Sequence, residues 1–104
     1  MSHADVLEML VKGFKKHDMS YDAYGGSENS SIVIRFEGAK ESDCSLSVMV
    51  YINKVEVQRT IGRGVINQSY DFEDIDDSFF ELLKEHLDTI KGLLKMRDKL
   101  LGDK

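Results

Sequence analysis

The chain has 104 residues, of which 41% are hydrophobic and 32% are charged, which is enough apolar material for one core and too little for two. We therefore expect a single domain spanning residues 1–104. Its net charge of −5 and its pI near 5.1 argue against direct binding to nucleic acid or to an anionic membrane, because both require a basic surface.

Three features bear on the compartment. The longest uncharged run, Cys44–Asn53, is about half as long as a membrane-spanning helix requires. Residues 1–5 lack the basic and apolar regions of a secretory signal. Cys44 is the single cysteine and cannot form an internal disulfide, which fits a reducing compartment. These features predict a cytoplasmic protein without a membrane segment, in which Cys44 is a small core residue.

The first quarter of the chain predicts a helix followed by an edge strand. Ser2 and Asp5 form a capping pair before an apolar helical stripe that ends near His17. Residues 19–24 alternate weakly between apolar and polar side chains, as an edge strand does. Residues 25–30 read Gly-Gly-Ser-Glu-Asn-Ser, which is the composition of a turn.

The middle of the chain predicts a run of antiparallel strands. Residues 32–37 alternate and have one apolar face, and we expect residues 38–43 to form the next loop. Leu46, Val48, Val50 and Ile52 give the clearest period of two, and the pattern continues at 55–61. Asn53-Lys54 is therefore predicted as a hairpin turn, since Asn tolerates a positive φ angle.

Gly62-Arg63-Gly64 breaks the last of these strands, and residues 65–70 are expected to form a short final strand or a bulged continuation. The predicted order is α-β-β-β-β-α, with an antiparallel sheet of about four strands. Both helices should cover one face of this sheet, which makes the fold class α+β.

A long amphipathic helix is predicted over residues 78–101. Ser78 and Glu81 fit a capping box, and Gly102 stands where a helix C-terminus favours glycine. At about 1.5 Å per residue the helix would run roughly 35 Å, longer than a sheet of ordinary strands is wide. Its last turns should therefore project and offer an apolar face, formed by Leu94, Met96, Leu100 and Leu101.

Five carboxylates lie between Asp71 and Asp77, and they would repel one another without a cation, a basic partner or water. Asp74, Asp76, Ser78 and Glu85 fall at positions one, three, five and twelve of a calcium-binding EF-hand loop. Phe79 occupies the sixth position, however, where that loop requires glycine. The alternative is a solvated acidic segment that stabilises the start of the long helix.

No catalytic or cofactor motif is complete. The three histidines share no metal-ligand spacing, and residues 62–67 lack the glycines and lysine of nucleotide-binding loops. Ser45 and Ser47 have no histidine at a recognisable distance. We therefore predict no metal, no cofactor and no enzymatic activity, while shallow binding of a small molecule stays open.

A folded array of Asp and Glu can present a field similar to that of DNA phosphates to the basic surface of a nucleic-acid-binding protein. Two aromatic side chains, Tyr70 just before the acidic run and Phe72 within it, are expected to be exposed. The candidate partner-binding residues are accordingly Tyr70, Asp71, Glu73, Asp74, Asp76 and Asp77.

Three features resemble the small acidic anti-CRISPR proteins that phages encode against Cas9. These are the opening amphipathic helix, the Gly/Ser/Asn turn before Ser-Ile-Val-Ile-Arg-Phe at 31–36, and Asn-Gln-Ser-Tyr-Asp at 67–71 leading into the acids. Members of that group block a DNA-binding surface with carboxylates, and the resemblance would assign this role to the acidic run. The chain departs from the group in its longer hairpin, 44–61, and in Phe72 and Ile75, which dilute the charge.

The alternative function is that of an adaptor. A layout of helix, antiparallel sheet and long C-terminal helix is similar to that of bacterial secretion-chaperone-like domains, which are also small and acidic. On this hypothesis the apolar end of the long helix forms a homodimer or binds an extended client. The acidic residues would then serve only to keep the protein in solution.

Overall fold

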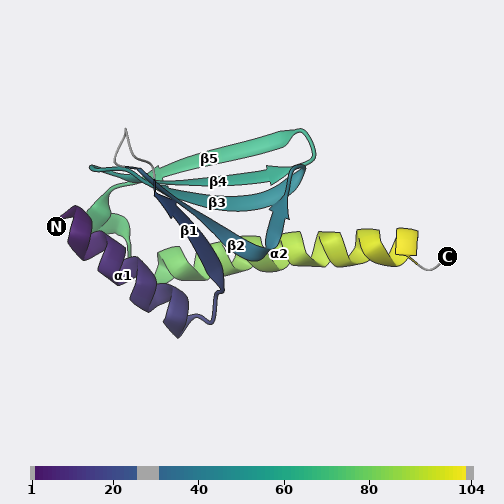
Figure 1. The fold of residues 1–104 in the computed structure, drawn as a ribbon, viewed down its shortest axis with the longest axis horizontal. Helices are drawn as coiled ribbons and strands as arrows, with labels where there is room; N and C mark the ends of the chain where they lie inside the picture. The colour runs from purple at the N-terminus through teal and green to yellow at the C-terminus, as the bar shows by residue number, and fades with distance from the viewer. Residues whose placement is uncertain (1, 26–30, 103–104) are drawn as a thin grey trace.

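The computed structural model describes residues 2–25 and 31–102. The elements, in chain order, are α1 (His3–Lys16), β1 (Tyr21–Gly25), β2 (Ile32–Glu41), β3 (Cys44–Val50), β4 (Val55–Ile61), β5 (Gly64–Tyr70), the 3-10 helix η1 (Phe72–Asp74) and α2 (Asp77–Gly102). The strands are adjacent in space in the order β1-β2-β3-β4-β5, and each pair is antiparallel (Figure 1).

The predicted α+β class is confirmed, with five strands rather than four. β5 is a separate strand rather than a bulged continuation of β4, and it pairs with β4 without interruption from Ile61↔Gly64 to Val55↔Tyr70. A two-residue turn at Gly62-Arg63 joins them. Gly62 has a φ of 60°, which glycine adopts without steric cost at the first central position of a tight hairpin.

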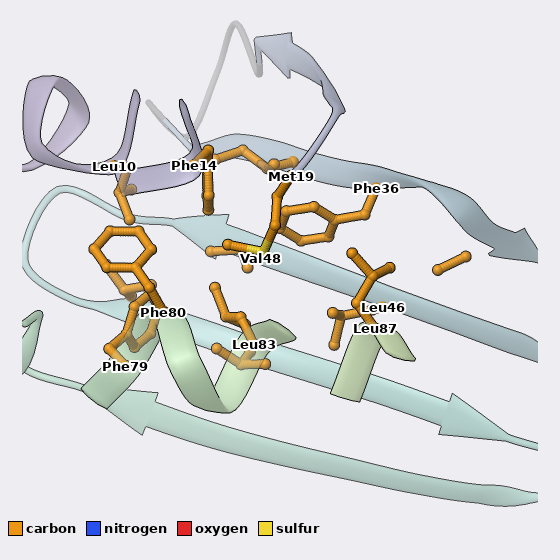
Figure 2. Packing of buried hydrophobic residues seen from close by; sticks show 14 of the residues in the cluster. Leu10, Phe14, Met19, Phe36, Leu46, Val48, Phe79, Phe80, Leu83 and Leu87 are labelled. Atoms are coloured by element: carbon orange, nitrogen blue, oxygen red, sulfur yellow. The ribbon is translucent and has the colours of Figure 1, made fainter. Parts of the chain in front are cut away.

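Both helices lie against one face of the sheet (Figure 1), as the sequence predicts. In β3 the side chains of Leu46, Val48 and Val50 are fully buried, while the alternate residues are only half-buried. The helices and the inner sheet face share one apolar cluster, part of which Figure 2 shows. No described helix is long and apolar enough to span a membrane.

The start of α2 is packed closely against α1. Gly13 of α1 is buried, and a Cβ atom built on it would collide with the ring of Phe80. That ring also makes an edge contact with Phe14, at 5.7 Å between centroids, and stacks on His17 at 5.6 Å. The absence of a side chain at Gly13 therefore allows the two helices to meet.

The prediction of a loop at residues 38–43 is wrong. Residues 38–43 are mostly strand, because β2 continues to Glu41 through a register shift between Arg35 and Lys40. Between the pairs Arg35↔Ser47 and Lys40↔Ser45, β2 has three more residues than β3. In this bulged region Gly38 takes a φ of 82° and Ala39 is fully buried.

The hairpin between β3 and β4 is confirmed, but its turn lies one residue earlier than predicted. The backbone N–H of Tyr51 donates to the carbonyl of Lys54 at 2.8 Å, which places Ile52 and Asn53 at the tip. Asn53 has no positive φ, and Ile52 is exposed rather than part of the apolar face. The strands predicted at residues 19–24 and 65–70 are confirmed as β1 and β5. Of the turn predicted at residues 25–30, Gly25 belongs to β1 and residues 26–30 lie outside the described residues.

The one cysteine, Cys44, is free and buried at the start of β3, as predicted for a small core residue. Burial raises the pKa of its thiol, and Asp43 raises it further. The thiolate form, which is the nucleophile, is therefore disfavoured.

The helix contact can be tested with two glycine substitutions. Gly13→Ala should destabilise the protein, because overpacking costs about 1–3 kcal/mol and outweighs a gain of up to about 1 kcal/mol in helix propensity. Gly92→Ala is the matched control, since Gly92 is exposed in α2 and its Cβ would meet nothing within 4 Å. We expect the control to raise the midpoint of urea unfolding. Equal midpoint shifts for the two variants would contradict the close packing at Phe80.

Candidate functional site

The acidic segment between β5 and α2 is fixed to the body by its apolar residues. Ile75 is buried, with 4% of its surface exposed. Tyr70 and Phe72 are half-buried against the core, and the Tyr70 ring makes an edge contact with Phe79 at 5.1 Å between centroids. The prediction that these two aromatic side chains are exposed is therefore wrong. They hold the segment in place, and the carboxylates lie on its outer side.

Asp76 caps the N-terminus of the long helix α2. Its Oδ1 accepts hydrogen bonds from the Ser78 hydroxyl and from the backbone N–H of Phe79, the latter at 3.2 Å. These two bonds hold the pKa of the Asp76 carboxyl below its usual range, with the hydroxyl contributing most. The predicted capping pair of Ser78 and Glu81 is thus wrong, because the helix starts at Asp77 and Asp76 supplies the cap.

Asp77 joins α2 to α1. Its two carboxylate oxygens accept hydrogen bonds from the Lys16 ammonium at 3.1 and 3.2 Å. This bond lowers the pKa of Asp77. The His17 ring lies at ion-pair rather than hydrogen-bond distance, with Nε2 3.6 Å from Oδ1. Asp77 therefore has a structural partner within the chain.

The remaining carboxylates of the predicted site are Asp71, Glu73 and Asp74. All three are exposed, and within the described parts of the chain none of them forms an ion pair. They lie on or beside the single turn of η1. The structure thus divides the predicted set of five carboxylates, leaving these three as the free negative surface, which we call the η1 carboxylates.

The second predicted surface lies at the end of α2, which extends past the sheet (Figure 1). Arg97 makes the last described polar contacts to the sheet, to Asp43 at 3.3 Å and to Glu41 at 3.7 Å. Beyond this point Leu100 is 79% exposed, and Met96 just before it is 65% exposed.

One predicted member of this surface belongs to the core instead. Leu94 is half-buried and packs against the apolar cluster, whereas its neighbour Leu93 is exposed. The exposed apolar side chains at this end are Leu93, Met96, Leu100 and Leu101, and we call them the α2 tip.

A cleft that the sequence did not predict lies between α2 and the end of β2. It has a volume of about 620 Å³ and is lined by Gly38, Lys40, Glu41, Lys91, Leu94, Lys95, Arg97 and Asp98. Lys40 forms ion pairs with Asp22 and Glu37, and Arg97 forms ion pairs with Glu41 and Asp43. The signal for this cleft in the sequence is the pair Lys91 and Lys95, which lie four residues apart on α2 and form the basic side of the cleft. The bulge at Gly38, which completes the cleft, could not be foreseen from spacing.

His86 has a shifted pKa and a polar contact to the sheet. His86 is half-buried, and its Nδ1 accepts from the Arg59 guanidinium at 3.1 Å. Burial first, and Arg59 second, lower the pKa of His86, so its ring is neutral at pH 7. This contact attaches α2 to β4. No group of three potential metal ligands gathers among the residues described.

The cap at Asp76 can be tested by its pH dependence. Because its folded pKa is depressed, the stabilisation exists above the ordinary value of 3.8 and is lost as pH falls through the folded pKa. We expect Asp76→Ala to lower the urea midpoint at pH 7. The gap to the wild type should narrow below pH 3.8, whereas Asp74→Ala should leave the midpoint nearly unchanged at both pH values. A pH-independent gap would contradict a charged cap.

Comparison of the chain with protein-family models, with curated proteins and with solved structures gives no match in any of the three. Two surfaces of the chain itself, the α2 tip and the η1 carboxylates, therefore indicate what the protein could bind.

Proposed function

We propose that this protein is a binding module that holds another protein through the α2 tip. The observation that supports this most is the concentration of four large exposed apolar side chains on one end of a helix that leaves the body. Full burial of a side chain such as Leu or Met contributes about 1.5–3 kcal/mol. Two or three of them are enough to drive a specific protein contact.

The charges around the α2 tip define the partner's chemistry. Lys95 and Lys99 are exposed beside the apolar side chains, together with one exposed carboxylate, Asp98. None of the three forms an ion pair within the described residues, so the unpaired charge here is positive on balance. Met96 and Leu100 are spaced by four residues and share one side of the helix. The best-fitting partner is therefore a protein with an apolar helix or groove that carries carboxylates at its rim.

The test is capture of partners from a lysate of the source cells with tagged protein, followed by titration of the purified partner. Leu100→Glu should weaken binding by about tenfold or more, since the buried leucine contributes more than about 1.4 kcal/mol. Lys15→Ala, at an exposed position of α1, is the matched control, because it changes the net charge by the same amount and leaves the α2 tip and its flanking lysines unchanged. Equal affinity of wild type and Leu100→Glu would refute the proposal.

A second function is favoured by the η1 carboxylates. Three exposed carboxylates without partners in the described chain form a negative patch that suits the basic surface of a nucleic-acid-binding protein. This is the inhibitor hypothesis in a narrower form. Asp76 and Asp77 are left out because the first caps a helix and the second binds Lys16.

Charge reversal separates this second function from the first. The triple variant Asp71→Arg, Glu73→Arg, Asp74→Arg should abolish capture of a basic partner, and the wild-type complex should weaken steeply between low and high salt. A matched triple reversal on the exposed positions Glu8, Glu81 and Asp88 controls for net charge. Retention of a salt-sensitive complex by the η1 variant would exclude this surface.

A further inference from the structure

The outer edge of β5 is unprotected. The seven residues of β5 include no charged side chain and no proline, and β5 pairs with β4 without a bulge. Val65 is 50% exposed and Ile66 is 46% exposed. Natural sheets usually block such an edge with charges, proline, bulges or a covering segment, because its free backbone groups pair readily with another strand. The opposite edge, β1, has five residues and carries Asp22.

The free backbone groups of β5 can be assigned from its pairing with β4. Ile61 and Gly64 close the two-residue hairpin and form a hydrogen-bonded pair, and such pairs alternate along an antiparallel ladder. The N–H and C=O groups of Gly64, Ile66, Gln68 and Tyr70 thus point to β4. Those of Val65, Asn67 and Ser69 point outward and are free to pair.

The charges that flank this strand are arranged symmetrically. Arg63 lies four residues before Asn67, and Asp71 lies four residues after it. Both are exposed, and neither forms an ion pair within residues 2–25 and 31–102. An antiparallel partner strand centred on Asn67 would place each Arg63 opposite an Asp71.

We propose that the protein forms a homodimer in which the β5 strands of two copies pair antiparallel about a two-fold axis at Asn67. In this register Val65 pairs with Ser69 of the partner subunit, and Asn67 pairs with Asn67 of the partner subunit. The three residues of each strand with free backbone groups then pair with residues of the partner strand whose backbone groups are also free. The backbone hydrogen bonds and the ion pairs therefore favour the same register.

Electrostatics selects this register and this edge. Each copy carries a net charge of −5, so two copies repel each other on average. Pairing at β5 brings together an uncharged strand and two complementary ion pairs. A shift by two residues in either direction keeps the backbone pattern but separates Arg63 from Asp71 of the partner subunit. The resulting dimer would contain one continuous sheet of ten strands, five from each copy.

The experiment is sedimentation velocity over a concentration series with a charge swap. The wild type should approach twice its monomer mass of 11.8 kDa. Arg63→Asp and Asp71→Arg should each weaken the dimer by at least about tenfold, because like charges then face each other across the seam. The double variant Arg63→Asp, Asp71→Arg should restore the dimer. Asp74→Arg, with the same charge change outside the strand, should leave it unaffected.

Three results would overturn the proposal. These are a wild type that stays monomeric at the highest concentration, a double variant that does not recover, and a dimer that Leu100→Glu splits while Arg63→Asp does not. The last result would place self-association at the α2 tip. As a second readout, Asn67→Cys should form a covalent dimer on mild oxidation, because paired residues on the axis lie about 5.5 Å apart. Gln58→Cys, in the interior strand β4, should not.

Discussion

The contact between Gly13 and the ring of Phe80 sets the position of both helices. It places the first turns of α2 against α1, where the rings of Phe79 and Phe14 make edge contacts with the Phe80 ring at 5.4 and 5.7 Å between centroids. The 26 residues of α2 then run about 39 Å from a fixed start. Because the start cannot move, the excess length has to appear at the other end. The projecting α2 tip is therefore a consequence of how the helix is anchored.

The acidic segment shows how one run of similar residues can take on different roles. Asp76 and Asp77 lie at the start of α2, where a helix dipole favours negative charge, and each has a defined partner. The three carboxylates before them have none among the described residues. Ile75 separates the two groups, because its burial turns the chain from η1 into α2. Charge density along the sequence cannot make this distinction, since it depends on where α2 starts and on which carboxylate reaches Lys16 of α1.

Much of the fold follows from patterns that are local in sequence. The period of two in β3 and β4 and the apolar stripe of α2 predicted these elements and the buried face. The wrong predictions also have physical causes. Ser78 and Asp76 are both good N-cap residues two positions apart, and only the hydrogen bond to Phe79 shows which one serves.

The surface predictions failed where they required three-dimensional information. Leu94 follows the buried Leu87 and Ile90 at helical spacing, so it lies on the side of α2 that faces the core. Whether it is covered or projects depends on how far the sheet extends along α2. The cleft needs Gly38 and Lys91, which are brought together only by the bulge in β2. The spacing of Lys91 and Lys95 indicates that they share one side of α2, but it does not indicate that the end of β2 lies opposite them.

The α2 tip and the outer edge of β5 lie on different elements, so a dimer formed at β5 leaves the α2 tip available for another protein. A two-fold axis at Asn67 stands perpendicular to the sheet, since residues that pair across it lie on the same face. Both helix layers would then cover the same side of the joined sheet, and the two α2 helices would point in opposite directions. The α2 tips would remain free, one on each copy. A partner with two binding segments could engage both, and its second contact would form at a high effective concentration. Dimerisation at β5 would thus strengthen binding at the α2 tips without adding any contact to them.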